Sequence, residues 1–426
     1  MSNILDIYPL SPLQEGMLFH ALYDEEAESC SYIVQISFLL RGYLDIPTFE
    51  RSWEYVINRH EILRAAFIWE EIENPLQVVY DHTLFKINEL DWSCMSSEER
   101  EEQVRLFLES DRKQRFQLDE APLMRVAVMK EADKEYRVVW THHHILLDGW
   151  SVSLLLNELF TVYVKMAGGE ALDFPKPPPY KKYIEWIKRQ DKNKAEQFWR
   201  KELKGFTAPT QLFLERKDRG KEKGYGESVC HLSEEKTQQL QTWVRNHQLT
   251  LNTLLQGAWA YLLSRYSGEN DIIFGVTSSG RPAELVGVEG IIGPFINTLP
   301  ARIGVADDLD IVDWLLEIQR NEIERRQYEY SSLTEIQGWS EVPREVPLFH
   351  TLYVFENYPT EKDNVNSELE ITQVQSVEQT NYPLNLVVIP GKQLSLKLMY
   401  DRSRFEETAM NRIQGHLLQV LNQMTE

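Results

Sequence analysis

Residues 136–151 read YRVVWTHHHILLDGWS, and this stretch decides how the surrounding chain folds. Its first part is strand-like, and a strand would place His142 and His144 on one face and His143 on the other. An Asp-Gly turn follows, and Ser151 is placed to cap a strongly apolar helix. The stretch therefore predicts a strand that delivers three histidines to a tight turn at a helix N-terminus.

Helical and strand patterns alternate on both sides of this stretch. This indicates the α/β class, as a mixed α+β fold in which helices and strands both contribute. To its N-terminal side, Asp45-Ile46-Pro47 opens one helix and Ser96-Ser97 another, each ahead of an apolar stripe. To its C-terminal side, Thr250 caps a further helix, and residues 382–400 predict a hairpin around Pro390-Gly391.

The length of 426 residues exceeds one ordinary hydrophobic core, so we expect two lobes. The proline-rich run at 174–179 resists helix formation and sheet pairing. It sets the expected division, with an N-terminal lobe at 1–174 that holds the histidines and a C-terminal lobe at 175–426. A glycine-rich segment at 278–293 lies between two predicted strands, and a loop of that length is typically functional.

The chain carries 45 Lys and Arg residues against 66 Asp and Glu residues, a net charge of −21. Such an acidic chain argues against nucleic acid and an anionic membrane as partners, because both require a basic surface. Cys30, Cys94 and Cys230 lie far apart and form no CxxC pair, so we expect free thiols in a reducing compartment. With no signal-peptide pattern and no long apolar run, we expect a cytoplasmic protein.

The three adjacent histidines suit proton transfer, because imidazole is the side chain that titrates nearest neutrality. Two other interpretations stay open, a bound zinc ion and histidines satisfied within the core. Zinc is disfavoured because a strand would bring only His142 and His144 together, without a third ligand. The sequence shows no GxSxG elbow and no phosphate-binding glycine loop, so it indicates neither a covalent acyl-enzyme nor a nucleotide site. We expect no metal and no tightly bound cofactor.

Residues 143–149, HHILLDG, resemble the HHxxxDG motif of the condensation domains of nonribosomal peptide synthetases. The shorter HxxxD pattern also occurs in coenzyme-A-dependent acyltransferases, so the resemblance depends on further matches. These follow the family's order along the whole chain: SPLQEGMLFH at 11–20, RHEILRAAF at 59–67, YKKYIEW at 180–186, IGPFINTLPAR at 292–302, YSSLTEI at 330–336 and LYVFENYP at 352–359.

The resemblance implies two chloramphenicol-acetyltransferase-like lobes that form a V-shaped pseudo-dimer with a central tunnel. A floor loop at about 278–293 and a latch at about 375–390 would bridge the lobes. The implied activity is peptide condensation, in which the amine of an acceptor aminoacyl thioester attacks a donor acyl or peptidyl thioester. Donor and acceptor peptidyl carrier proteins would deliver these substrates on phosphopantetheine arms, and an adenylation domain of the same synthetase would be a further partner. We expect the isolated domain to be a monomer.

The resemblance also implies a role for each residue of the motif. His144 is the implied catalytic residue, either as the base that accepts the amine proton or as the group that orients the amine and stabilises the intermediate. Asp148 is implied to pair with Arg64 as an architectural brace. His143, on the opposite face of the strand, would be structural, and Gly149 would serve the turn and access to the tunnel.

Three further positions, Trp150, Ser151 and Asn297, are candidates for lining the tunnel. Trp150 is more typical of packing, and Asn297 could equally be a strand-end amide satisfied by the backbone. The run after the Asp-Gly turn fits condensation rather than epimerization domains, and the intact histidines disfavour heterocyclization. Residues 59–64 favour an L-configured donor, whereas residues 14–20 also resemble domains that accept D donors.

Two rival functions remain open. A free-standing acyltransferase would turn over soluble acyl-coenzyme A without a carrier protein. A silent docking module would bind a carrier protein and form no amide. The sequence contains no adenylation domain and no recognisable pantetheinylated serine, so we expect it to be one part of a larger synthetase.

Overall fold

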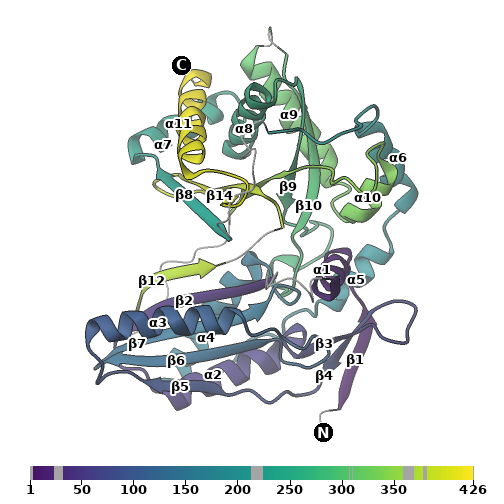
Figure 1. Cartoon of the computed structure of the whole chain (residues 1–426). Coiled ribbons are helices and arrows are strands. Elements are labelled where there is room, and N and C mark those ends of the chain that lie inside the picture. The colour runs from purple at the N-terminus through teal and green to yellow at the C-terminus, as the bar shows by residue number, and fades with distance from the viewer. Residues whose placement is uncertain are drawn as a thin grey trace. The chain divides into compact units, whose positions relative to one another are not determined.

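The structure is a computed structural model that describes residues 3–23, 32–212, 224–306, 308, 310–357, 369–377 and 381–425. Its helices and strands form two compact units (Figure 1). Unit 1 comprises residues 1–189, 281–295 and 358–380, and unit 2 comprises residues 190–280, 296–357 and 381–426. Both units mix helices and strands, which confirms the expected mixed α/β class.

Unit 1 contains a five-stranded sheet of order β12-β2-β7-β6-β5, in which only β5 and β6 are parallel, and an antiparallel sheet of order β1-β4-β3. The strands are β1 (Ile4–Pro9), β2 (Ile33–Arg41), β3 (Ala65–Ile68), β4 (Leu76–Tyr80), β5 (Ile87–Asp91), β6 (Met124–Ala132), β7 (Glu135–His143) and β12 (Glu370–Val377). The helices are α1 (Pro12–Tyr23), α2 (Ile46–Arg59), α3 (Ser97–Arg112), α4 (Gly149–Ala167) and α5 (Lys181–Lys188), with short 3-10 turns η2 (Glu61–Arg64) and η3 (Val288–Gly290).

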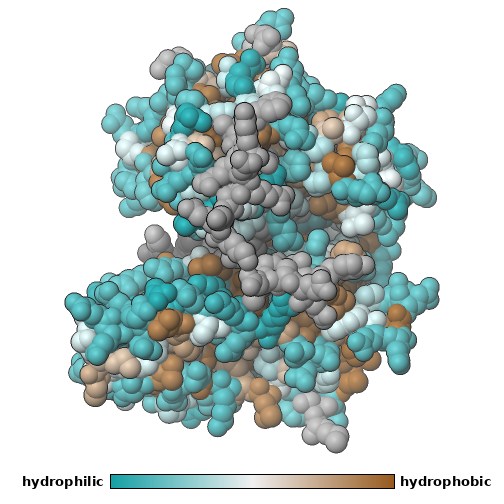
Figure 2. Space-filling view, viewed as in Figure 1, coloured by the Kyte–Doolittle hydropathy of each residue, from teal (hydrophilic) through white to brown (hydrophobic). Residues whose placement is uncertain are grey.

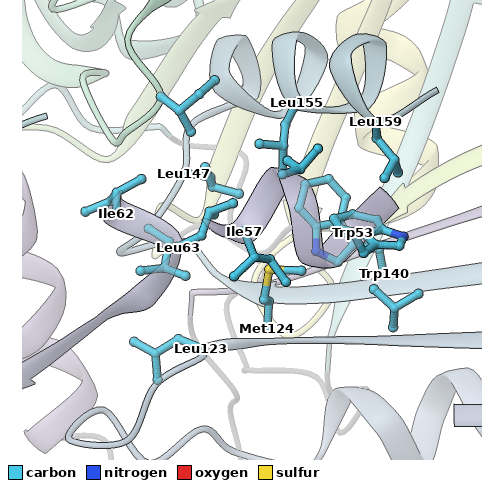
Figure 3. Packing of buried hydrophobic residues seen from close by; sticks show 14 of the residues in the cluster. Trp53, Ile57, Ile62, Leu63, Leu123, Met124, Trp140, Leu147, Leu155 and Leu159 are labelled. Atoms are coloured by element: carbon cyan, nitrogen blue, oxygen red, sulfur yellow. The ribbon is translucent and has the colours of Figure 1, made fainter. Parts of the chain in front are cut away.

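Helices α2 and α4 cover one face of the five-stranded sheet, and α3 covers the other (Figure 1). On the α2–α4 face, the rings of Trp53 and Trp140 pack with their centroids 5.1 Å apart, beside Leu155 and Leu159 (Figure 3). Leu147 adds its side chain to the same cluster (Figure 3). The turn that follows the three histidines is therefore anchored in the core of unit 1.

The predicted strand and helix around the histidines are confirmed, but the helix begins earlier than expected. Helix α4 starts at Gly149, and its N-cap is Asp148 rather than Ser151. An N-cap needs extended backbone and a side-chain acceptor. Asp148 has φ −101° and ψ 173°, and its carboxylate accepts the backbone N–H of Ser151 at 2.7 Å. Ser151 already lies within the first turn.

Unit 2 is built on a six-stranded sheet of order β10-β9-β11-β13-β14-β8, in which β11 runs parallel to β9 and β13. Helices α7, α8, α9 and α11 contribute to one core with this sheet. The strands are β8 (Tyr225–His231), β9 (Asp271–Ser278), β10 (Asn297–Gly304), β11 (Thr351–Phe355), β13 (Leu384–Ile389) and β14 (Ser395–Asp401). The helices are α6 (Lys192–Glu202), α7 (Glu234–Asn246), α8 (Leu251–Ser267), α9 (Ile311–Arg326), α10 (Leu333–Trp339) and α11 (Glu407–Met424). The Thr250 cap of α8 and the β13–β14 hairpin are as predicted.

The division between the units differs from the expected one at 174/175. The proline-rich run stays in unit 1, where Arg59 donates to the carbonyls of Phe174 and Pro175 and places its guanidinium over the Phe174 ring. Unit 1 therefore continues to residue 189. Unit 1 also includes two segments from much later in the chain. These are residues 281–295, which overlap the expected floor loop, and strand β12.

Strand β12 covers the first part of the expected latch and pairs antiparallel with the outer edge of β2. Residues 378–380 of that latch lie outside the described residues, whereas 381–390 fold with unit 2.

Hydrophilic side chains cover most of the surface seen in Figure 2, in keeping with the charged composition. Of the helices that the structure describes, none is long and apolar enough to cross a membrane. Cys94 and Cys230 are free cysteines, as expected, while Cys30 lies outside the described part of the chain.

Candidate active site

The turn after β7 fixes the position of His144 through its backbone. Strand β7 ends at His143, and the N–H of His144 donates to the carbonyl of Tyr32 at 2.8 Å. The N–H of Leu147 donates back to the carbonyl of His144 at 3.3 Å, which closes the turn. His144 therefore follows the strand instead of belonging to it, so strand alternation does not govern its direction as the sequence suggested.

The three histidines differ in exposure. His142 is 1% exposed and His143 is 4% exposed, whereas His144 is partly exposed. Burial lowers the pKa of His142 well below its ordinary value and lowers the pKa of His143 to about 3. In both cases the nearby His144 adds a smaller effect in the same direction. His142 and His143 are therefore neutral at neutral pH.

His143 supports the turn directly. Its Nδ1 accepts a hydrogen bond from the backbone N–H of Ile145 at 3.1 Å, which places the ring proton on Nε2. His142 has no hydrogen bond from either ring nitrogen within the described structure, and it packs against Trp140 with ring centroids 4.8 Å apart. Both contacts agree with structural roles. Among the described residues, no group of three His, Cys, Asp or Glu side chains lies close enough to hold a metal ion.

Asp148 is the centre of a buried brace that links α4 to residues 281–295. One carboxylate oxygen accepts the Ser151 N–H, and the other accepts the Phe295 N–H at 3.0 Å. The guanidinium of Arg281 lies 3.5 Å from the same carboxylate, and both side chains are almost fully buried, at 4% and 0% exposure. Arg281 also donates to the carbonyls of Val288 and Ile291.

The expected pairing of Asp148 with Arg64 is wrong. Arg64 instead donates to the carbonyls of Ile57 at 2.7 Å, Asn58 at 2.5 Å and Tyr80 at 2.9 Å. Its place at the end of η2 brings it to the C-terminal end of α2, where backbone carbonyls lack helical partners. Arg64 therefore closes α2, and Arg281 takes the role in the brace.

The structure gives Ser151 and Trp150 contacts with the same segment. The Ser151 hydroxyl is fully buried, donates to the Gly293 carbonyl at 2.7 Å and accepts the Gly293 N–H at 3.0 Å. The Trp150 indole donates to the Glu289 carbonyl at 3.1 Å. Gly149 is the first residue of α4. These contacts favour packing roles for Ser151 and Trp150 over contacts with substrate.

Asn297 belongs to unit 2, at the start of β10. Its amide donates to the carbonyls of Glu329 and Ser331, both at 2.7 Å, and its oxygen accepts the Thr298 N–H. The side chain is 8% exposed. These bonds favour the alternative interpretation of Asn297, an amide satisfied by the backbone.

Gln14 is a residue of the site that the sequence reasoning missed. It is fully buried and donates to the Ile145 carbonyl at 3.1 Å, directly after His144. Its amide oxygen accepts the Ser11 N–H and the amide of Gln77. The available signal was its position within the run at 11–20 that resembles a family motif.

Comparison with known proteins bears on this site. The family described as Condensation domain matches residues 4–426. A linear gramicidin synthase from Brevibacillus parabrevis is 46% identical over 435 residues, which cover 99% of this chain and 8% of that protein. Bacitracin synthase 3 of Bacillus licheniformis is 35% identical over 430 residues, which cover 100% of this chain and 7% of that protein. The chain therefore spans less than a tenth of the length of these two relatives.

Two solved structures share the fold. The X-domain from teicoplanin biosynthesis matches with a TM-score of 0.83 at 22% identity, covering 98% of this chain and 94% of that one. The starter condensation domain of rhizomide synthetase matches with a TM-score of 0.83 at 18% identity, covering 98% and 95%. At these identities the likeness concerns the fold alone, and it confirms the expected fold class.

Proposed function

The chain belongs to the condensation-domain family of nonribosomal peptide synthetases, and we propose that His144 is the residue that acts on its reacting atoms. Condensation domains form peptide bonds. The proposed donor is an acyl or peptidyl thioester, and the proposed nucleophile is the amine of an acceptor aminoacyl thioester. Donor and acceptor carrier proteins would present both on phosphopantetheine arms, and an adenylation domain of the same synthetase would select the acceptor.

The proposed reaction needs one group that can accept and return a proton. Attack of the amine on the thioester carbonyl forms the C–N bond and a tetrahedral intermediate, and collapse of that intermediate breaks the C–S bond. The amine proton passes to neutral His144, and the resulting imidazolium returns it to the departing thiolate. The products are an amide and a free thiol. Because the thioester is already activated, positioning of amine and carbonyl supplies the rest of the rate enhancement.

The observation that carries the proposal is the difference among the three histidines. His142 and His143 are buried and held neutral, whereas His144 is partly exposed at the start of a turn that the core fixes. Asp148 is an unsuitable base, since both of its oxygens accept backbone N–H groups and Arg281 lies against it. Among the side chains of the motif, His144 therefore best meets the demands of proton transfer.

The test is a single-turnover condensation with donor and acceptor carrier proteins loaded with defined substrates, followed by intact-protein mass spectrometry. Removal of a general base typically lowers the rate about 10²–10⁴-fold, and we expect His144→Ala to fall in that range. His82→Ala, at an exposed histidine of unit 1, is the matched control. An undiminished rate for His144→Ala refutes the proposed role.

Further arms of the assay distinguish peptide condensation from the two rival functions and test the finer expectations. Turnover of soluble acyl-coenzyme A without a donor carrier protein would indicate a free-standing acyltransferase. Carrier binding without amide formation by the unaltered chain would indicate a silent docking module. Parallel L and D donors test the proposed preference for an L donor, and light scattering tests the proposed monomer.

A further inference from the structure

Unit 2 contains a cavity of about 330 Å³ beside the end of β10 and along α9. Three buried apolar side chains, Ile303, Trp314 and Ile318, contribute to its wall. Arg325 also lines it, together with the amides of Asn270 and Asn321. All of these residues belong to unit 2, and none is part of the candidate active site in unit 1.

Arg325 is the unusual member of this lining. Its side chain is buried, with an exposure of 3%. Across the described residues, its guanidinium has neither a hydrogen bond nor an ion pair. Burial lowers its pKa, and the negative charges of Glu322 and Glu202 oppose that effect. Buried arginines are almost always paired, whereas Glu322 and Glu202 act on this guanidinium through their charge without a hydrogen bond or ion pair to it.

The neighbouring charged groups are already engaged. Arg302 binds both carboxylate oxygens of Asp271, at 2.7–3.2 Å, and donates to two backbone carbonyls. Glu322 accepts from Arg326 at 2.6 Å and from Asn252 at 3.1 Å. The Trp314 indole donates to the Gly304 carbonyl at 2.7 Å. Among the described lining residues, Arg325 is therefore the cationic donor that remains available to a ligand.

We propose that this cavity binds a carboxylate group carried on a short apolar body. A guanidinium presents a planar fork of N–H groups that matches a carboxylate, and Asn321 can add a neutral donor. Ile303, Trp314 and Ile318 provide the apolar contact that ligand cavities typically offer. Glu317 also lines the cavity, and its negative charge disfavours a doubly charged phosphate.

This chemistry has two possible sources. One is a free small carboxylic acid, and the other is an aspartate or glutamate side chain next to an apolar residue in a polypeptide segment. Both place the same group against Arg325. Binding assays with matched probes distinguish them.

The experiment follows the Nε–H signals of ¹⁵N-labelled arginine in the whole chain by NMR. The Arg325 signal is assigned by its disappearance in Arg325→Lys. The probes are 4-methylpentanoate, the capped peptide N-acetyl-Leu-Asp-Leu-amide, and inorganic phosphate. We expect a saturable shift of the Arg325 signal with at least one carboxylate probe, and weaker binding of phosphate.

Variants test whether the cavity itself is the site. Arg325→Gln should weaken binding of the carboxylate probe at least tenfold, read from the shifts of neighbouring amides. Arg320→Gln removes the same charge from an exposed position of α9 and should leave affinity unchanged. Ala306→Phe, at an exposed lining position, should obstruct the cavity without altering Arg325. It keeps the test available if Arg325→Gln fails to fold.

Each outcome has a defined meaning. Binding of both carboxylate probes, or of one alone, supports the site, and the preferred probe identifies the source. Absence of saturable binding by either carboxylate overturns the proposal. So does tighter binding of phosphate, or unchanged carboxylate affinity in Ala306→Phe.

Discussion

The brace between Asp148 and Arg281 makes a quantitative prediction. Replacing Arg281 with methionine keeps a long side chain but leaves the buried Asp148 carboxylate without its cation. At 3.5 Å and an effective dielectric constant of 20, the lost attraction is about 5 kcal/mol. The two backbone N–H groups that still bind Asp148 offset part of this loss. We therefore expect Arg281→Met to lower the free energy of unfolding of unit 1 by about 3–5 kcal/mol, as for other broken buried pairs.

The companion variant Asp148→Asn tests the other side of the pair. Both carboxylate oxygens accept backbone N–H groups, so one position of an amide would set an NH₂ group against an N–H donor. An unsatisfied buried group costs about 1–3 kcal/mol. The double variant Arg281→Met with Asp148→Asn removes both charges, so neither is left buried without the other. The double variant should therefore lose at least about 2 kcal/mol less than the sum of the single changes.

The assay is urea unfolding, with hydrogen exchange of peptides from β7 and α4 as the local readout for unit 1. Arg105→Met is the matched control, because Arg105 pairs with Glu102 and Glu109 on the exposed surface of α3. Exposed pairs contribute about 0–1 kcal/mol. If Arg281→Met destabilises unit 1 no more than Arg105→Met, or if the two changes at the brace are additive, the reasoning about a buried ion pair fails.

Two further predictions concern unit 1. His143 has a pKa of about 3 in the fold against about 6.5 when unfolded, so the unfolded chain binds more protons between these values and stability falls as pH decreases through that window. Between pH 7.5 and 5.0 this amounts to about 2 kcal/mol. Unfolding at pH 7.5 and 5.0 should therefore show that much less acid sensitivity in His143→Gln, whereas His416→Gln, at an exposed histidine, should keep the acid sensitivity of the unaltered chain. Equal sensitivity in both variants would contradict the assignment. Gly293→Ala would place a Cβ 2.2 Å from the Tyr180 ring, whereas a Cβ at Gly290 meets nothing within 4 Å. We expect Gly293→Ala to lose about 1–3 kcal/mol in urea unfolding and Gly290→Ala far less, and similar values for the two would show that Tyr180 moves freely aside.

Local patterns in the sequence predicted the elements well, because their causes are local. The Thr250 cap and the strand-like run of β7 each depend on residues within a few positions. The cap of α4 was assigned to Ser151 instead of Asp148, since both residue types are good caps and only backbone geometry distinguishes them.

Contacts across long sequence separations could not be predicted in the same way. The partner of Asp148 is Arg281, 133 positions away, and nothing in the spacing of either residue distinguishes it from Arg64. The inclusion of β12 in the sheet of unit 1 is a similar case, because its residues are almost all exposed and no burial pattern in its sequence specifies a partner strand. For the site, the motif identified the histidines, whereas burial separated His144 from its two neighbours.

The discontinuity of unit 1 has a consequence for synthesis of the chain. During translation, β2, β7 and Asp148 emerge from the ribosome long before Arg281 and β12. During that interval the nascent sheet has an open edge at β2, and the carboxylate of Asp148 has not yet met Arg281. Unit 1 therefore cannot finish folding while only its N-terminal part has been synthesised. Its last strand, β12, emerges only after most of unit 2 has been translated.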